Sequence, residues 1–245
     1  MDASTNLYER YTSTSALASS QDPSKILCWS KGYFRANFAA LLPENKNAKI
    51  LEVGCGYGRY LLCLAEMGFS NCYGIDISRE QITYAKDSLN LKNVEEADAF
   101  LWLNDKESVY DCILCIDILE HFSTHDLLIL GEKVCSALKP DGVAIFQIPN
   151  GMSPLNPIIY GDLTHVRAFT PQSMQQFFLN IGLAPLRYLH IPPHIYNITS
   201  LCKRIIWTFF IQPLIHAIVL TTHGRVFGGN IYTSNFIAYA KRKPV

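Results

Sequence analysis

The chain has 245 residues, of which 49% are hydrophobic and 17% are charged, and its 21 basic residues balance its 21 acidic ones. This length and composition allow one large α/β domain with a sizeable core, and the zero net charge argues against a dedicated nucleic-acid-binding protein. The eight cysteines are scattered and the first 25 residues are polar, so we expect free thiols in a reducing cytoplasm.

After a polar arm at residues 1–24, apolar runs that predict buried strands alternate with segments that predict helices. In chain order, these are a helix at 26–42, a strand at 49–53, a helix at 60–67, a strand at 72–77, a helix after Ser78, strands at 93–97 and 110–117, a helix at 125–138 and a strand at 143–148. Ser78 and Gln81 have the spacing of a capping box, and residues 139–142 predict a turn. The alternation predicts βαβ units and a doubly wound, mostly parallel sheet, which binds ligands at the carboxyl ends of its strands.

Two later segments interrupt this pattern. Residues 149–170 predict a long loop, and an insertion at 191–230 separates strand-like residues 186–191 from strand-like residues 231–240. We therefore divide the chain into four parts. They are an N-terminal arm and helix at 1–43, a ligand-binding core at 44–190, a helical insertion at 191–230 that caps the substrate or meets a membrane, and a last strand with a basic tail at 231–245.

A glycine-rich loop follows the first predicted strand, in the sequence Leu51-Glu-Val-Gly-Cys-Gly-Tyr-Gly58. Glycines at 54, 56 and 58 allow a sharp turn and a close approach of the backbone to a ligand. The dinucleotide-binding pattern G-x-G-x-x-G is not met, because Arg59 stands at its third glycine. Glu52 suits a ligand ammonium group and would repel a pyrophosphate. The alternative is a glycine-rich turn that binds nothing.

Two further acids follow predicted strands. Asp76 lies 18 residues after Gly58, where a carboxylate can accept both hydroxyls of a ribose. Asp98 follows the third strand, where it could receive an adenine amino group. The alternatives are an acid at the start of a helix for Asp76 and a surface loop acid for Asp98.

Taken together, these motifs resemble class I S-adenosylmethionine-dependent methyltransferases. The resemblance rests on the following matches, in family order: Glu52-x-Gly-x-Gly-x-Gly58, Asp76, Asp98, Asp117-Ile-Leu-Glu-His121 and Leu138-Lys-Pro-Asp-Gly142. It implies a seven-stranded Rossmann-like fold with S-adenosylmethionine as cofactor. The implied cofactor-binding residues are Glu52, Gly54, Cys55, Gly56 and Gly58 for the methionine part, Asp76 and Ile77 for the ribose, Asp98 and Ala99 for the adenine, and Ile116 and Asp117 for the methyl end. The turn at Asp141 departs from the family's usual Pro-Gly-Gly.

A second resemblance concerns a narrower branch. The segment from Tyr160 to Pro171, Tyr-Gly-Asp-Leu-Thr-His-Val-Arg-Ala-Phe-Thr-Pro, is similar to methyltransferases encoded with polysaccharide and lipopolysaccharide biosynthesis. Tyr8-x-x-Arg10-Tyr11 resembles the same branch. This likeness implies a sugar hydroxyl as the methyl acceptor.

A hydroxyl acceptor must lose its proton, and histidine is the usual base near neutral pH. His165, in the loop over the strand ends, is the first candidate, with Asp162 to orient it or to bind the acceptor. His121, after the fourth strand, is the second candidate, and for both histidines a structural role is the alternative. Asp117 and Asp162 could instead bind a divalent metal, but no tight cluster of oxygen ligands is visible, so we expect no metal.

The insertion contains the apolar stretch 201–220, flanked by Lys203, Arg204 and Arg225. Gln212, Pro213 and His216 interrupt it, which disfavours a membrane-spanning helix. All 21 acidic residues lie at or before Asp162, so residues 1–162 carry a formal charge of −8 and the rest +8. Peripheral contact with the inner face of a membrane through 201–225 is one interpretation. A helix that covers the core or a dimer interface is the other, and attraction between the two charged parts within one domain would explain the charges.

We therefore expect a cytoplasmic O-methyltransferase that acts on a sugar hydroxyl of a glycan or glycolipid precursor and binds no nucleic acid. The first alternative is a small-molecule or quinone-like O-methyltransferase, which would also explain the apolar insertion. An N-methyltransferase and a non-catalytic cofactor-binding protein stay open. A nicotinamide-dependent oxidoreductase is disfavoured by the spacing of the glycines.

Overall fold

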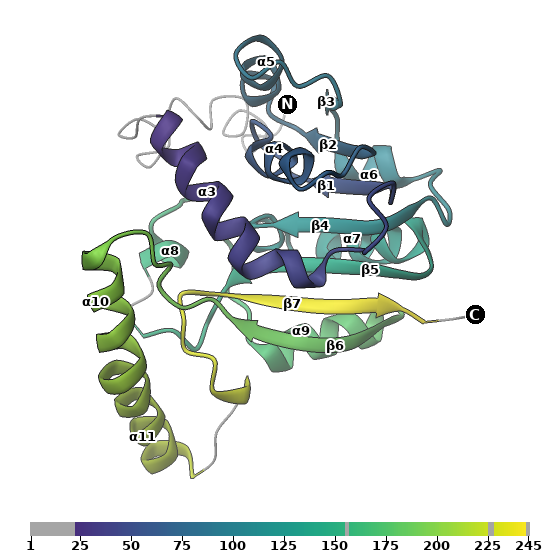
Figure 1. The fold of residues 1–245 in the computed structure, drawn as a ribbon. Helices are drawn as coiled ribbons and strands as arrows, with labels where there is room; N and C mark the ends of the chain where they lie inside the picture. The colour runs from purple at the N-terminus through teal and green to yellow at the C-terminus, as the bar shows by residue number, and fades with distance from the viewer. Residues whose placement is uncertain (1–22, 155–156, 225–227, 244–245) are drawn as a thin grey trace.

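The computed structural model describes residues 23–154, 157–224 and 228–243 (Figure 1). A seven-stranded sheet in the order β3-β2-β1-β4-β5-β7-β6 forms the centre of this part of the chain. Strand β7 is antiparallel to both of its neighbours, and the other pairs are parallel. The predicted doubly wound, mostly parallel sheet is confirmed. The strands are β1 Ile50–Val53, β2 Cys72–Asp76, β3 Val94–Glu96, β4 Tyr110–Ile116, β5 Leu138–Pro149, β6 Leu183–His190 and β7 Asn235–Arg242.

Helices cover both faces of the sheet (Figure 1). They are α3 Pro23–Phe38, η1 Ala39–Leu41, α4 Arg59–Glu66, α5 Arg79–Asp87, α6 Ala99–Leu103, η2 Leu119–His121, α7 Thr124–Ala137, α8 Pro157–Tyr160, α9 Pro171–Asn180, α10 Ile198–Ile206, η3 Trp207–Ile211, α11 Gln212–His223 and η4 Gly228–Asn230. Cys115 packs in the core that includes residues of α7 and α9, and Cys112 packs in the core that includes residues of α3 and α4. This separation is what the alternation of side chains along a strand requires.

The structure differs from the sequence-based expectation at several elements. Ser78 precedes α5, but its side chain makes no capping hydrogen bond. Its backbone N–H, which a capping box would give to the Gln81 side chain, donates instead to the Asp76 carboxylate. The turn predicted at 139–142 is an irregularity within β5, where the register with β4 shifts and Asp141 has a φ of 66°. The predicted loop at 149–170 contains the short helix α8, and α9 was not predicted. Of the predicted arm at 1–24, residues 1–22 lie outside the described residues, and Pro23 and Ser24 begin α3.

The order of the strands reverses between β1 and β4, which are hydrogen-bonded neighbours in the sheet. A crevice opens outside the carboxyl ends of parallel strands at such a point, and ligands bind there. The glycine-rich loop follows β1, and Asp117 follows β4, so the fold brings both to this crevice.

The insertion before β7 forms a continuous helix, Ile198–His223, made of α10, η3 and α11. This helix projects from the sheet at its lower left in the view of Figure 1. Only 6% of its most apolar 18-residue stretch is buried. The interpretation that the insertion covers the core is therefore wrong, while the apolar helix before the last strand is confirmed.

Candidate active site

The glycine-rich loop turns through three left-handed residues, Gly54, Gly56 and Gly58, with φ values of 71°, 55° and 79°. A Cβ atom on Gly54 would lie 2.6 Å from Cδ1 of Ile118, the residue after Asp117. Position 54 therefore favours glycine, because another residue would be strained at this φ and would have to displace the Ile118 side chain. The backbone N–H groups of Gly54 and Cys55 donate to the Ile75 carbonyl at 2.8 and 3.0 Å, which fixes the loop to β2.

Glu52 is buried in β1, and its Oε2 atom has no hydrogen-bond partner among the described residues. Burial raises the pKa of this carboxyl to about 8, while nearby Arg59 lowers it and Asp76 raises it. An unpartnered buried carboxylate oxygen is costly. An ammonium group such as that of a methionine moiety would satisfy it, so Glu52 fits the predicted role.

Arg59 was given no role from the sequence, although it directly follows the last glycine. Its guanidinium lies 4.5 Å above the ring of Tyr60 and interacts electrostatically with Glu52 and Asp117. Arg59 therefore places a positive charge close to both Glu52 of β1 and Asp117, which follows β4. Its position at the first residue of α4 was the signal that could have identified it.

The Asp76 carboxylate connects β2 to the glycine loop. Its Oδ2 accepts the N–H of Gly56 at 2.7 Å, and its Oδ1 accepts the N–H of Ser78 at 2.8 Å. Burial raises the pKa of Asp76, and these two hydrogen bonds partly offset that effect. A carboxylate has about four acceptor positions, so two remain for the hydroxyls of a ribose. Ile77, the next residue, is exposed.

The remaining predicted cofactor residues differ in what they can offer. Asp98 caps α6, because its Oδ1 accepts the N–H groups of Phe100 and Leu101 at 2.8 and 3.0 Å. Ala99 is the first residue of that helix. The Cys55 side chain is buried against Gly74 of β2, so its backbone is the part left for a ligand. Ile116 is buried at the end of β4. The contacts of Asp98 and Ala99 with adenine stay predictions.

Asp117 has a left-handed φ of 53°, which is uncommon for a residue other than glycine. Gln147 of β5 donates to both of its carboxylate oxygens, at 2.9 and 2.8 Å, and Asn235 of β7 donates to Oδ1 at 3.2 Å. The hydroxyl of Tyr33 in α3 donates to Gln147 Oε1 at 2.6 Å. Three elements distant in sequence therefore fix this carboxylate.

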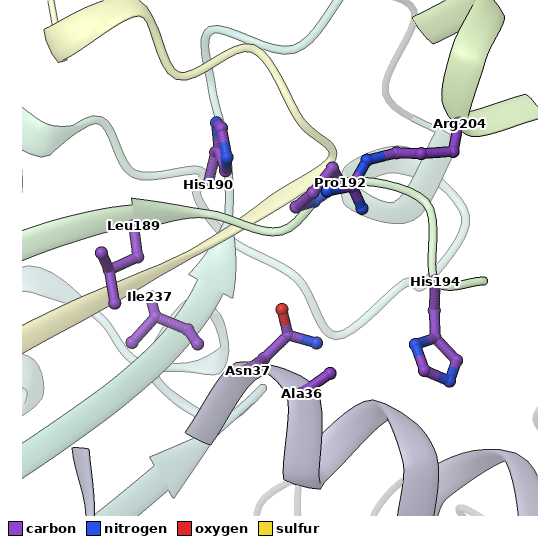
Figure 2. Close-up of a pocket in the computed structure, with 8 residues that line it drawn as sticks. All are labelled: Ala36, Asn37, Leu189, His190, Pro192, His194, Arg204 and Ile237. Atoms are coloured by element: carbon purple, nitrogen blue, oxygen red, sulfur yellow. The ribbon is translucent and has the colours of Figure 1, made fainter. Parts of the chain in front are cut away.

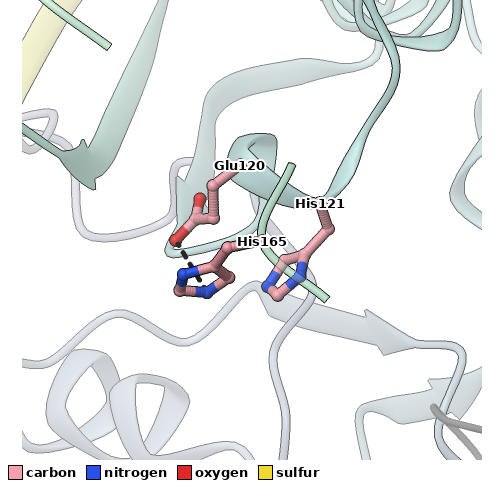
Figure 3. Close-up of side chains that lie close together, drawn as sticks. All are labelled: Glu120, His121 and His165. Carbon is pink, nitrogen blue, oxygen red and sulfur yellow. Dashed lines mark ion pairs between the residues drawn. The ribbon is translucent and has the colours of Figure 1, made fainter. Parts of the chain in front are cut away.

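Glu120, His121 and His165 meet beside the end of β4 (Figure 3). Glu120 Oε1 lies 4.0 Å from His165 Nε2, and both side chains are at least nine-tenths buried. Glu120 Oε2 and His165 Nδ1 have no hydrogen-bond partner among the described residues. Burial, followed by the nearby Asp117, raises the pKa of Glu120 well above its usual value. Glu120 is thus the carboxylate next to His165, and no local sequence pattern distinguishes it.

His121 is held through the loop that carries His165. Its Nδ1 lies 2.9 Å from the hydroxyl of Thr164, and that hydroxyl donates to Asp162 Oδ1 at 2.6 Å. Asp162 therefore orients Thr164 and, through it, His121. Burial and then His165 lower the pKa of His121 to about 4. His121 is accordingly neutral and weakly basic near pH 7.

The same three side chains could also hold a cation. Each offers one ligand atom, and these atoms lie within 4.8 Å of one another. Two imidazoles and one carboxylate suit a transition metal better than Mg²⁺ or Ca²⁺, which take oxygen ligands. The sequence analysis considered Asp117 and Asp162 as metal ligands, but both carboxylates accept hydrogen bonds from the protein. Gln147 and Asn235 donate to Asp117, and Thr164 donates to Asp162.

A separate cleft of about 340 Å³ lies between α3 and the segment that joins β6 to α10 (Figure 2). Its lining shares no residue with the candidate site. Arg204 reaches into it from α10, where it donates to the Pro193 carbonyl at 3.2 Å. Burial and then Arg204 lower the pKa values of His190 and His194, so Arg204 supplies the positive charge of this cleft.

Solved structures of similar shape support the assignment of the fold. A SAM-dependent methyltransferase from Archaeoglobus fulgidus superposes with a TM-score of 0.67 at 18% identity, covering 98% of this chain and all of that one. A second SAM-dependent methyltransferase, from Mesorhizobium loti, gives a TM-score of 0.58 at 18% identity, with 86% and 98% covered. At these identities the likeness shows the fold.

Among curated proteins, this chain is similar to the ubiquinone biosynthesis O-methyltransferases of two Rickettsia species. The R. akari protein is 33% identical over 106 residues, which is 42% of this chain and 40% of that protein. The R. conorii protein is 28% identical over 142 residues, which is 56% and 47%. The chain thus spans less than half the length of these relatives.

The profile of the methyltransferase-domain family matches residues 29–201, most of the chain and all of the segments that build the crevice. That match and the fold agree with the glycine loop, which fits a methionine ammonium group and disfavours a pyrophosphate. The chain belongs to the methyltransferase-domain family, and its glycine loop, Glu52 and Asp76 fit the S-adenosylmethionine cofactor that the sequence predicts.

Proposed function

We propose that this methyltransferase transfers its methyl group to a hydroxyl oxygen, and that the acceptor is a sugar hydroxyl of a lipid-linked glycan precursor. The observation that carries the oxygen assignment is the buried pair of His165 and Glu120 at the carboxyl end of β4. A hydroxyl must give up a proton as its oxygen is methylated, whereas a neutral amine is nucleophilic enough to attack directly and can lose its proton afterwards. A histidine with a carboxylate partner is suited to the first reaction.

S-adenosylmethionine, when bound, supplies a methyl group that its sulfonium already activates. The chain's own residues then have two tasks, to align the acceptor oxygen within about 3–3.5 Å of the methyl carbon and to keep water out. The ring of His165 accepts the hydroxyl proton, and the positive charge that it gains favours the ionised form of Glu120, 4.0 Å away, which in turn stabilises the imidazolium. His121, with its pKa of about 4, is too weak a base for this step, and Asp162 holds its ring in place through Thr164.

Two observations support the choice of acceptor. The segment from Tyr160 to Pro171, which contains His165, resembles the branch of the family associated with polysaccharide biosynthesis. The exposed apolar helix Ile198–His223 suits an acceptor with a lipid tail. A quinol-like acceptor is the second candidate, because the Rickettsia relatives are named ubiquinone biosynthesis O-methyltransferases and such an acceptor is also lipid-tailed.

The same reasoning gives a proposed location and organisation. We place the protein in the cytoplasm, in peripheral contact with the inner face of a membrane through residues 201–225, and we propose no nucleic-acid partner. Residues 44–190 would bind the cofactor, 191–230 would cap the acceptor or meet the membrane, and 231–245 would complete the sheet. Arg225 lies outside the described residues.

A labelled-methyl assay tests this proposal. The full chain is incubated with S-adenosylmethionine labelled in the methyl group and with a sugar nucleotide, a lipid-linked glycan, a quinol or a small amine. We expect label on the lipid-linked glycan. Label on the quinol alone would select the second candidate, label on an amine would overturn O-methylation, and the absence of transfer to every acceptor would favour a non-catalytic protein.

A further inference from the structure

The helix Ile198–His223 is the one segment of the described chain that is long and apolar enough to cross a membrane, yet it is almost entirely exposed. A large exposed apolar surface usually marks a site that binds another protein or a membrane. Phe209 and Phe210 are 69% and 66% exposed, and Leu214 is 59% exposed. Ile206 is 51% exposed, and Ile206, Phe210 and Leu214 follow one another along α10, the π-helical η3 and α11. Other exposed apolar side chains on it are Leu201, Ile205, Ile211, Ile218 and Leu220.

The charges near the helix point to a lipid partner. No acidic residue follows Asp162, so the helix and the strands on either side of it carry only basic charges. Lys203 is exposed on α10, next to the apolar face. Arg204 turns back toward the domain, where it donates to the Pro193 carbonyl (Figure 2). Basic residues beside an apolar helical face are typical of helices that bind anionic membrane surfaces.

The connections of the helix decide how it can lie in a bilayer. It leaves the sheet after β6 and returns before β7, and these two strands are hydrogen-bonded neighbours. Ile231 and Tyr232 are already buried in the domain, and His216 Nδ1 lies 3.2 Å from the Tyr232 hydroxyl. Both ends of the helix are therefore held by one folded domain.

A spanning orientation would place Ile198 and His223 on opposite sides of a hydrocarbon core roughly 30 Å thick. The chain would then have to recross this core between His223 and Ile231, and eight residues reach at most ~26–29 Å when fully extended. Irregular backbone exposed to lipid would also leave its polar groups unpaired. The fold thus excludes a single crossing.

We propose that Ile198–His223 is an in-plane membrane anchor, with its apolar face in the interface of an anionic bilayer and both ends on the same side. This proposal extends the proposed function, and the role of the anchor depends on that function. Strand β6 runs parallel to β4 and β5, so the helix starts at the sheet edge that also carries Asp117. In Figure 1, α8 and α10 lie at this same edge. The anchor would hold the acceptor side of the crevice at the membrane surface.

Vesicle flotation of the full chain, without cofactor or acceptor, tests the anchor independently of activity. We expect the protein to float with phosphatidylcholine–phosphatidylglycerol vesicles. The double variant Phe209→Ser/Phe210→Ser should lose this binding at least tenfold. The matched control is Leu179→Ser/Leu186→Ser, which replaces two exposed leucines outside the helix and should bind as the wild type does. Lys203→Glu should weaken binding to anionic vesicles selectively.

A wild-type protein that stays at the bottom of the gradient would overturn the proposal. So would a dimer in solution that the Phe209→Ser/Phe210→Ser variant dissociates, because a second copy would then cover the face. If methyl transfer to a lipid-linked acceptor in detergent is normal while flotation fails, only the anchor is refuted.

Labelling of cysteines tests the in-plane orientation. Cys202 is exposed near the start of the helix, and Thr222→Cys adds a second thiol near its end. A membrane-impermeant maleimide is applied to sealed vesicles that carry the protein, and peptide mass spectrometry locates the label. Labelling at both positions is expected. Protection of one position until detergent is added would show a spanning helix and contradict the proposal.

Discussion

The cofactor side of the crevice and its acceptor side are held together by different kinds of contact. On the cofactor side, backbone N–H groups of Gly54, Cys55 and Gly56 are bound by Ile75 and Asp76. On the acceptor side, one backbone hydrogen bond joins the Val166 N–H to the Glu120 carbonyl at 2.9 Å, and the site itself is formed by the side chains of His165 and Glu120. The positive φ values of the glycine loop allow few other residues at these positions. A contact between side chains, in contrast, can be changed by a single substitution. One scaffold can therefore keep its cofactor while its acceptor differs.

The largest expected effect separates the two sides through His165. His165→Ala should lower the turnover of a hydroxyl acceptor by about 10²–10⁴-fold, the range attributed to a general base, and leave cofactor affinity unchanged. Steady-state kinetics together with calorimetric titration of the cofactor measure both quantities. His125→Ala, an exposed histidine of α7, is the matched control. Normal turnover in His165→Ala would make His165 a structural residue.

Asp76→Ala should give the opposite pattern. Loss of the charged hydrogen bonds to a ribose should weaken cofactor binding by roughly 10–100-fold, and turnover at saturating cofactor should change much less. Asp76→Asn keeps one acceptor oxygen and should show a smaller loss. Asp87→Ala, on the exposed side of α5, serves as the control. Unchanged affinity in Asp76→Ala would refute the assigned role.

The cofactor side and the acceptor side of the crevice also differ in how much of each could be predicted from the sequence. The glycine loop, Asp76 and Asp117 stand in short local patterns at the ends of predicted strands, so their placement at one edge could be predicted. The contact of Gln147 and Asn235 with Asp117 joins β5 and β7 to β4. No local pattern encodes such a contact.

Local rules also failed where two of them competed. Ser78 and Gln81 have the spacing of a capping box, but Asp76 at the end of β2 accepts the N–H of Ser78 that Gln81 would accept in that motif. Glu120 belongs to a quoted motif, yet its proximity to His165 depends on the fold of a loop 45 residues later. The exposure of Ile198–His223 could not be read from its composition, because a buried helix has the same composition.

A smaller effect concerns Glu52 and pH. Its pKa in the folded protein is raised to about 8 by burial, above the ordinary value of 4.5, so the protonated form favours folding. This contribution is complete below pH 4.5 and is lost as the pH rises through 8. Glu52→Gln stays neutral, so its melting temperature should exceed that of the wild type by more at pH 8 than at pH 5. About 1 kcal/mol would shift the melting temperature by ~2–4 °C.

Differential scanning calorimetry without cofactor at the two pH values checks this sign. A gap that is equal at pH 5 and pH 8 would contradict a buried, neutral Glu52. Glu95→Gln, at an exposed position of β3, controls for the general effect of removing a carboxylate.

The smallest expected effect is that of a chelator. If His165 acts as the base, treatment with EDTA followed by desalting should leave turnover unchanged. Loss of activity that Zn²⁺ or Mn²⁺ restores would instead show that Glu120, His121 and His165 hold a metal ion, because their ligand atoms lie close enough together.

The most direct test of the central claim is to locate the transferred methyl group by tandem mass spectrometry. The wild type and His165→Ala are compared on a lipid-linked glycan in anionic vesicles with labelled S-adenosylmethionine. The account predicts a labelled methyl ether on a sugar oxygen with the wild type and a product yield at least tenfold lower with His165→Ala. A label on nitrogen, or equal amounts of methyl ether from both proteins, would contradict it.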